Sequence, residues 1–154
     1  MIINDQLLKP VILESKNNDR RRKNYNFHKE MEDPLQRMIN VLQPDSYVQP
    51  HKHENPDKRE AFIILKGRLL VIIFSAEGEI TESAILDHSL GNYGYDIDAG
   101  VFHSIIALEA DTVVYEVKDG PYFPLDDKNF ATWAPKEGDM DALSYNEKLK
   151  KLLL

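Results

Sequence analysis

The sequence predicts a mainly β protein, an antiparallel barrel or sandwich with a short helix at its start and a partly helical tail at its end. Two observations carry this prediction. Short apolar segments follow one another closely between turn residues, and no helical pattern lies between them. Close spacing of this kind favours antiparallel over βαβ architecture. The length of 154 residues and the 42% apolar content fit one domain with one sizeable core.

Nine segments read as strands because each is short, rich in β-branched or aromatic residues and bounded by Pro, Gly, Asp or Asn. They are residues 23–28, 35–42, 47–53, 59–65, 69–74, 80–86, 93–97, 102–108 and 112–117. Tight turns at Gly67 and at Gly78 predict two hairpins, which join 59–65 to 69–74 and 69–74 to 80–86.

The two ends have a different pattern. Residues 5–16 place Leu8 and Val11 on one helical face, with Pro10 expected to kink the helix or to cap a second short turn. After Gly120, prolines and charges predict an irregular surface tail, followed by a helix at 144–154 with Ser144 as its N-cap. We therefore expect one domain in three parts: an N-terminal helix and basic segment (1–22), the barrel (23–120) and a C-terminal extension (121–154).

The composition excludes several classes of partner. A net charge of −7 argues against a nucleic-acid surface, and the longest apolar run, residues 69–74, is too short to span a membrane. The chain has no cysteine, so metal ligands must be His, Asp or Glu. The first ten residues lack the pattern of a signal peptide, which leads us to expect a cytoplasmic protein.

His51 and His53 begin the argument for a metal site. Residues two apart in a strand point to the same face, about 6–7 Å apart, so both imidazoles can reach one ion. Glu60 opens the next apolar strand and is the preferred carboxylate ligand. Glu54 is its rival, although it should face the opposite side of the strand from His53. His103 follows a turn at Gly100 and supplies a third imidazole.

Such a site would hold one divalent ion and leave one or two coordination positions for water or ligand. The sequence does not choose among iron, zinc, manganese and nickel.

Two segments carrying these residues, HKHENPDKREAFIILKG and IDAGVFHSI, resemble the paired motifs of the cupin superfamily. His51, His53, Glu60 and Gly67 match the first motif, and Gly100 and His103 match the second. Three positions depart from the family pattern, none of them a metal ligand: Asp45, Asp98 and Ala107. The resemblance implies a jelly-roll barrel, also called a double-stranded β-helix, and a homodimer.

A narrower resemblance covers most of the chain. The segments RRRKNYNFH, DPLQRMINVLQPDSYVQPHKHENPDKREAFIILKG and GPYFPLDDKNFATWAPKEGD are similar to the WbuC family of cupin metalloproteins. That family is associated with bacterial polysaccharide and O-antigen biosynthesis and brings no established reaction with it.

These features lead to three hypotheses of function. The first is a metal-dependent enzyme acting on a small polar molecule such as a sugar or sugar nucleotide. It would be either an oxygenase or an isomerase or epimerase, and in the latter case Glu60 or a metal-bound hydroxide would be the base. The second is a non-catalytic carbohydrate-binding or regulatory module braced by the metal. The third is a metal-free epimerase with a His and Asp pair, against which the histidine pair and Glu60 argue.

Four residues are candidates for contacting a ligand. Gln49 shares the strand face of His51 and His53, Arg37 lies on a flanking strand, and Asn26 and His28 share the other face from Tyr25. The basic run from Arg20 to Lys23 is read as a solvated surface patch. Its alternative function is an anion clamp, since guanidinium groups suit phosphate and carboxylate.

Overall fold

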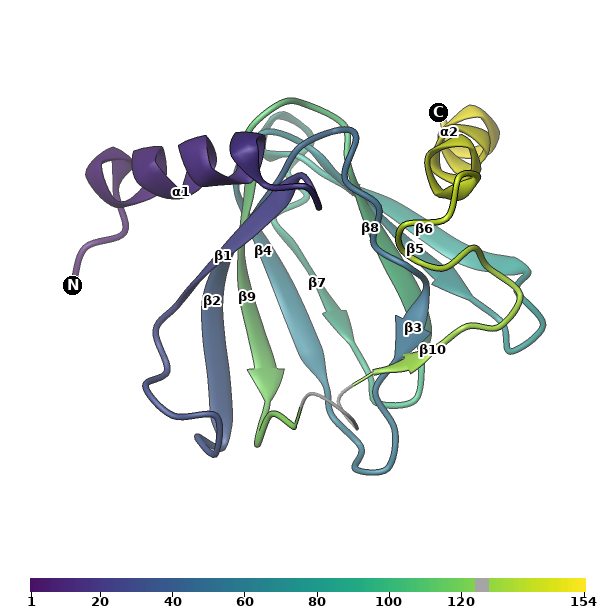
Figure 1. The fold of residues 1–154 in the computed structure, drawn as a ribbon, viewed down its shortest axis with the longest axis horizontal. Coiled ribbons are helices and arrows are strands. Elements are labelled where there is room, and N and C mark those ends of the chain that lie inside the picture. Colours follow the sequence, from purple (N-terminus) through teal and green to yellow (C-terminus); the bar gives the residue numbers. More distant parts are fainter. Residues whose placement is uncertain (124–127) are drawn as a thin grey trace.

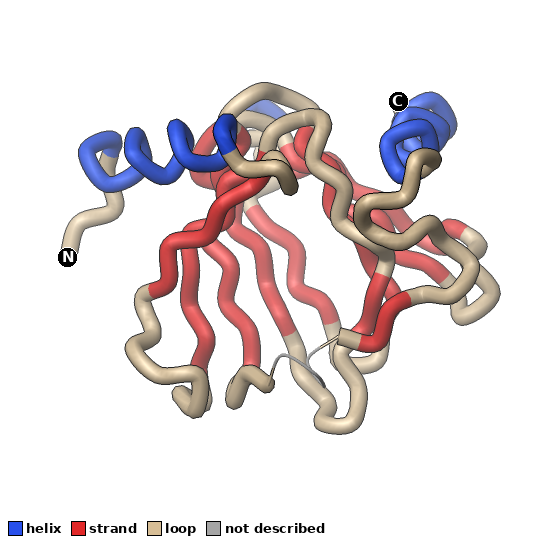
Figure 2. Tube along the Cα trace, in the orientation of Figure 1, coloured by secondary structure: helices blue, strands red, loops and turns tan. Residues whose placement is uncertain are grey.

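Two five-stranded antiparallel sheets face each other in the computed structural model, which describes residues 1–123 and 128–154 (Figures 1 and 2). The first sheet has the order β1-β2-β9-β4-β7, and the second has the order β10-β3-β8-β5-β6. This is the predicted mainly β, jelly-roll type of barrel, with one helix at each end of the chain.

Apart from β3 and β10, the element bounds agree closely with the predicted segments. The first sheet contains β1 (Arg22–Asn26), β2 (Leu35–Leu42), β9 (Thr112–Asp119), β4 (Glu60–Lys66) and β7 (Gly94–Ile97). The second contains β10 (Asn129–Phe130), β3 (His51–Lys52), β8 (Phe102–Ala107), β5 (Leu69–Phe74) and β6 (Ile80–Leu86). The helices are α1 (Asp5–Asn17), the short 3-10 turn η1 (His88–Leu90) and α2 (Ala142–Leu153).

Three apolar clusters explain how the layers hold together. The central cluster fills one end of the space between the sheets and includes Phe62, Leu69 and Val114. A second cluster joins Leu8 and Val11 of α1 to the outer face of the first sheet. The third joins α2 to the outer face of the second sheet. Each helix therefore covers the outside of one sheet, as Figure 1 shows.

The inner face of the first sheet changes from apolar to polar along its strands. Alternation points Val114, Glu116 and Lys118 of β9 inward, and the register places Lys118 beside Glu60 and Glu116 beside Phe62. On the other side of β9, the inward residues at the polar end of β2 are Gln36, Met38 and Asn40. The apolar end belongs to the core, and the polar end forms the wall of a cavity.

The predicted hairpin at Gly67 is wrong, because β4 and β5 belong to different sheets. The chain crosses between the sheets at this turn, so the apolar faces of the two strands meet across the core rather than side by side. Gly67 has a φ of 75°, and a Cβ there would lie 2.5 Å from Oγ1 of Thr112. The predicted hairpin at Gly78 is confirmed, since β5 pairs with β6.

The predicted strand at 47–53 is shorter than expected, and only His51 and Lys52 are in a strand. The backbone before them is bonded elsewhere: the carbonyl of Tyr47 accepts from the guanidinium of Arg22, and that of Val48 accepts from the hydroxyl of Ser104. Pro50 has no N–H to donate. In this segment, hydrogen bonds from side chains take the place of backbone hydrogen bonds to a neighbouring strand.

The C-terminal extension differs from the prediction in two respects. Residues 129–130 form β10, which pairs with β3 and was not predicted. The last helix begins at Ala142 after Asp141, so Ser144 is not its N-cap but lies in its first turn, where its hydroxyl donates to the carbonyl of Asp141. α1, in contrast, is confirmed and continues through Pro10.

Candidate metal centre and ligand cavity

His51, His53, Glu60 and His103 converge at one point between the two sheets, and all four are buried. His51 and His103 are directly opposite each other in the β3–β8 ladder. His53 follows one residue after the end of β3, and Glu60 is the first residue of β4. The pairing of β3 with β8 joins two of the histidines, and Glu60 faces them from the other sheet. The fold thus brings together residues separated by up to half of the barrel sequence.

The donor atoms of these four residues lie within 4.8 Å of one another. Ligands on opposite sides of one ion with bonds of about 2.1 Å are about 4.2 Å apart, so the cluster has nearly the dimensions of a coordination shell. Nε2 of His53 lies 3.5 Å from Oε2 of Glu60, and Nε2 of His103 lies against Oε1 of the same carboxylate.

Backbone carbonyls orient two of the imidazoles. Nδ1 of His51 is 2.9 Å from the carbonyl oxygen of Gln49, and Nδ1 of His103 is 2.9 Å from that of Val101. A ring that donates from Nδ1 leaves the lone pair of Nε2 for a metal, an arrangement found around most metal-binding histidines. The donor set therefore fits a divalent ion.

The charge states also fit. Burial, followed by the charge of Lys128, holds the pKa of His51 well below its usual range, so the ring is neutral as a ligand must be. Burial would raise the pKa of Glu60, but the charges and hydrogen bonds of His103 and His53 outweigh it and hold that pKa well below its usual range. Glu60 is therefore ionised.

Glu54, the rival carboxylate, lies outside this cluster. Its side chain is 40% exposed and forms an ion pair of 2.7 Å with Lys52. The alternation of side chains along the strand predicted this outcome.

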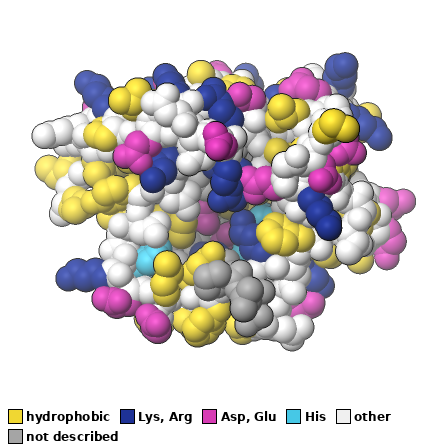
Figure 3. Space-filling model, in the orientation of Figure 1, with side chains coloured by type: hydrophobic (Ala, Val, Ile, Leu, Met, Phe, Trp, Pro, Cys, Tyr) yellow, Lys and Arg dark blue, Asp and Glu magenta, His cyan; other side chains and the backbone are white. Residues whose placement is uncertain are grey.

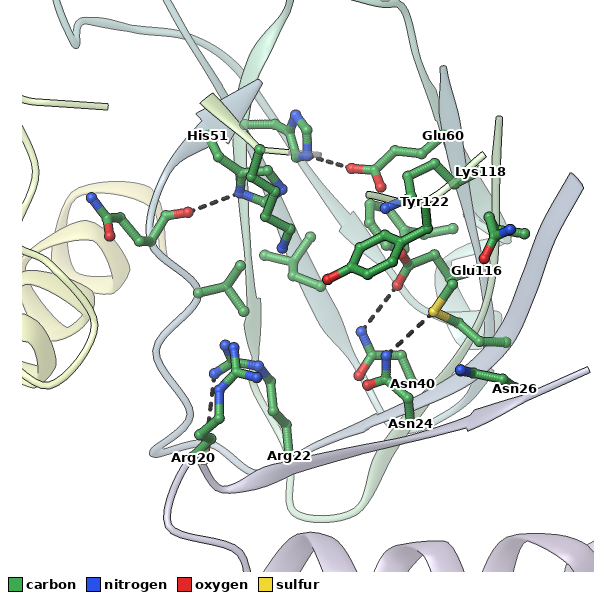
Figure 4. A pocket seen from close by; sticks show the side chains of 18 of the residues that line it. Arg20, Arg22, Asn24, Asn26, Asn40, His51, Glu60, Glu116, Lys118 and Tyr122 are labelled. Atoms are coloured by element: carbon green, nitrogen blue, oxygen red, sulfur yellow. Dashed lines mark hydrogen bonds and ion pairs between the residues drawn. The ribbon is translucent and has the colours of Figure 1, made fainter. Parts of the chain in front are cut away.

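The cluster opens onto a cavity of about 400 Å³, a volume in the range of small-molecule sites. His51, Glu60 and His103 are among its lining residues. Figure 3 shows basic and acidic side chains mingled on this face of the molecule, with histidine atoms visible between them. Figure 4 shows the cavity from close by, with His51 and Glu60 on one side of it.

Polar groups line much of the wall. The amide of Asn40 donates to the buried carboxylate of Glu116 at 3.0 Å, and the ammonium of Lys118 lies over the ring of Tyr122 (Figure 4). Asn24 extends this surface along β1. None of these residues was predicted from the sequence. Polar side chains at alternate positions of a barrel strand, as at Glu116 and Lys118, are the signal that could have found the wall.

The four predicted ligand-contacting residues are not all in one place. Gln49, His28 and Asn26 line the cavity. Arg37 is not among the lining residues, because it alternates with Gln36 and Met38, which point inward on the same strand. The backbone carbonyl of Arg37 is instead 3.1 Å from Nδ1 of His28.

The basic run divides between two surfaces. Arg20 and Arg22 line the cavity and bind Glu137 of the C-terminal extension. Arg21 pairs with Asp45 and Lys23 with Glu14, and neither residue lines the cavity. The prediction of a solvated surface patch therefore describes only Arg21 and Lys23.

Glu116 gives a test of the electrostatics of the cavity. Burial, and then the charge of Glu60, raises the pKa of Glu116 above its usual 4.5. The folded protein therefore binds this proton more tightly than the unfolded chain does. The resulting contribution to stability is fully present below the unfolded pKa and is lost as pH rises through the folded pKa.

The free energy of unfolding of wild type should fall between about pH 5 and pH 7.5, because Glu116 ionises. Glu116→Gln cannot ionise at this position, so its free energy of unfolding should fall less over the same range. The measurement is urea denaturation of chelator-treated protein at both pH values. Glu77→Gln, in the exposed β5–β6 turn, is the matched control and should behave as wild type. Identical pH dependence of Glu116→Gln and wild type would contradict the raised pKa.

The fold and this cluster define a class, a cupin-fold barrel with a buried three-histidine, one-glutamate group that could bind a metal ion. Residues 3–86 match the model of a family described as a domain of unknown function, DUF6016. Since the match spans more than half of the sequence, the chain belongs to that family. No curated protein matches the sequence.

Several solved structures share the fold. CapF from Staphylococcus aureus, described as a capsular polysaccharide assembling protein, is similar with a TM-score of 0.60 and 22% identity over 73% of this chain and 30% of CapF. The chain thus spans about a third of the length of CapF. KdgF from Halomonas sp. gives a TM-score of 0.51 with 17% identity over 67% of this chain and 81% of KdgF. TT1209 from Thermus thermophilus gives 0.54 with 18% identity over 77% of this chain and 97% of TT1209.

At these identities the similarity shows the fold alone. Within the part of the chain that the structure describes, no helix is both long enough and apolar enough to cross a membrane.

Proposed function

We propose that this protein holds one divalent metal ion with His51, His53, Glu60 and His103 and uses it to bind a small hydroxyl-rich molecule, such as a sugar or sugar nucleotide, in the adjoining cavity. The observation that carries the proposal is the opening of the buried cluster onto that cavity. A metal that only braced the barrel would have no need of a cavity, since structural sites are closed and functional sites keep an open position.

Three imidazoles and one carboxylate suit iron, zinc, manganese or nickel. Such an ion supplies Lewis-acid activation of a bound oxygen or, if it is redox-active, activation of dioxygen. Lewis-acid activation would serve isomerisation or epimerisation, and activation of dioxygen would serve oxygenation.

Proton transfer to or from the bound molecule needs a general acid or base beside it. Glu60 was the candidate base, but the same carboxylate is needed as a ligand. Glu116 lies on the cavity wall, is held by Asn40 and has a raised pKa, which brings a carboxyl closer to the range useful for general acid–base catalysis. Glu116 is therefore the second candidate for this role.

The choice of a sugar rests on two resemblances. The sequence is similar to the WbuC family, and the fold is similar to that of CapF, whose description names capsular polysaccharide assembly. We infer a role in bacterial polysaccharide biosynthesis from both. The homodimer, the cytoplasmic location and the three-part division at residues 22 and 120 stay predictions.

A non-catalytic carbohydrate-binding module is the second candidate, and the same cavity favours it equally. A metal-free epimerase is disfavoured, because the imidazoles and the carboxylate would then face one another in a buried site without the ion that suits their geometry.

Elemental analysis of protein purified without nickel affinity resin tests the proposal. We expect about one transition-metal ion per chain. Iron would direct the next assay to oxygen consumption, whereas zinc or manganese would direct it to turnover of sugar nucleotides. Binding of sugars without turnover would favour the non-catalytic module. The proposal fails if the purified chain carries no metal and takes up none on titration with zinc, manganese, iron and nickel.

A further inference from the structure

Arg20 and Arg22 form a fork that holds both oxygens of one carboxylate. Nε and Nη2 of Arg20 donate to Oε1 and Oε2 of Glu137 at 2.7 and 2.9 Å, and Nη2 of Arg22 donates to Oε2 at 2.8 Å. Planar guanidinium groups in this arrangement recognise carboxylate and phosphate through paired, charge-assisted hydrogen bonds. The three donors therefore already make an anion site, which a carboxylate of the chain itself fills.

The fork belongs to the cavity, and Arg22 is fixed in place. The side chain of Arg22 is only 10% exposed, and its Nη1 donates to the carbonyl of Tyr47 at 2.8 Å, which holds the guanidinium in one orientation. The side chain of Arg20 is 59% exposed, so this residue lies at the rim. Pre-organised donors lose little conformational entropy when an anion binds.

The charge of the cavity has the opposite sign to that of the whole protein. Among its described lining residues, four are Arg or Lys and three are Glu, whereas the whole chain has a net charge of −7. A divalent ion at the histidines would make the cavity still more positive. An anionic ligand is therefore attracted here, although the protein as a whole repels it.

We propose that Arg20 and Arg22 are the anion-binding subsite of this cavity, and that the carboxylate or phosphate of the ligand replaces Glu137 there. This inference rests on the proposed function for the identity of the cavity and narrows the ligand to an anionic, hydroxyl-bearing molecule such as a sugar acid or sugar phosphate.

The positions of the other lining residues agree with such a ligand. In Figure 4 the arginine pair lies apart from His51 and Glu60, and Asn24 and Asn40 lie on a further side of the same cavity. A molecule with its anionic group on the arginines would present hydroxyl groups to the amides and an oxygen to the metal site. Amide side chains both donate and accept, as hydroxyl recognition requires.

The extension can release Glu137 without leaving the barrel. Tyr47 donates from its hydroxyl to the carbonyl of Pro135 at 2.6 Å, and the backbone of Ala131 donates to the carbonyl of Pro50. These bonds anchor residues on the N-terminal side of Glu137, so exchange of one carboxylate for another requires movement only near that side chain.

The test titrates inorganic phosphate into metal-free protein at constant ionic strength and follows the arginine side-chain resonances by NMR. Arg20→Gln should weaken phosphate binding about tenfold, the usual value of a lost charge-assisted hydrogen bond. Glu137→Gln should tighten it about two- to fivefold, because a partly exposed ion pair no longer competes. Lys23→Gln, which removes one positive charge of the same run outside the cavity, is the matched control and should change binding little.

The test is strict because Arg20→Gln and Glu137→Gln should change the affinity for phosphate in opposite directions. If Glu137 only ties down the extension, Glu137→Gln will weaken or leave unchanged the affinity for phosphate, and the inference is overturned. An equal loss in Lys23→Gln and Arg20→Gln, or no saturable binding to wild type and Glu137→Gln, would overturn it as well. Because the protein is metal-free, these outcomes are separate from the failure of the metal site, which elemental analysis reports.

Discussion

His103→Ala is expected to lower the affinity for a divalent metal by at least about 100-fold, since even residues that only support a ligand contribute about 10- to 100-fold. His103 is buried, lies opposite His51 in the β3–β8 ladder and pairs with Glu60, so its removal takes one donor from the cluster and a partner from the carboxylate. Competition titration with a chromophoric chelator measures the affinity directly.

Thermal unfolding gives a second measure of the same effect. An ion that binds only the folded state at about 100 times its Kd stabilises that state by about 2.7 kcal/mol. Added metal should therefore raise the Tm of wild type and have little effect on His103→Ala. His88→Ala, in the exposed η1 turn, is the matched histidine control and should keep the wild-type affinity. Unchanged metal affinity in His103→Ala would remove this residue from the ligand set.

Leu149→Ala is expected to destabilise the folded protein by about 2–4 kcal/mol, the usual cost of deleting a buried leucine side chain. Leu149 is the α2 residue that is buried in the cluster with Leu70, Ile72 and Ile106 on the outer face of the second sheet, and it is 4% exposed. The substitution leaves a cavity between helix and sheet. Urea denaturation followed by circular dichroism measures the loss.

Leu152→Ala provides the comparison on the same helix. Leu152 is 64% exposed, and its truncation should change the free energy of unfolding by less than about 0.5 kcal/mol. Equal effects of the two substitutions would mean that α2 does not pack on the sheet through Leu149. The two leucines share chemistry and helix, so helix propensity does not account for a difference between them.

Most of the strands could be predicted because their signals are local. The segments 69–74 and 80–86 coincide with β5 and β6, since each is a short run of strand-forming residues between turn residues. The partners of a strand are not a local property. The sequence around Gly67 is compatible both with a hairpin and with a crossing between sheets, and only the packing of the two apolar faces selects the crossing.

The same distinction applies to the candidate site. Strand alternation placed His51 and His53 together, and the motif resemblance added Glu60 and His103, which the structure brings into one cluster. Glu137 lies in a segment that resembles the WbuC family, but the resemblance assigns it no role, and its contact with Arg20 spans 117 positions of the chain. Arg37 shows the limit of choosing residues by proximity in sequence, because one step along a strand reverses the direction of a side chain.

The position of β9 affects the order in which the chain must fold. β9 lies between β2 and β4 in the first sheet, although β2, β4 and β7 all precede it in the chain. Until residues 112–119 have left the ribosome, β2 and β4 each have an unpaired edge, and open edges of this kind promote aggregation. Their pairing also spans long stretches of sequence, which slows folding. A nascent chain that ends just after His103 would contain all four candidate ligands yet lack β9, the strand that joins β4 and β7 to β1 and β2. Metal loading should therefore follow the completion of the barrel and not guide it.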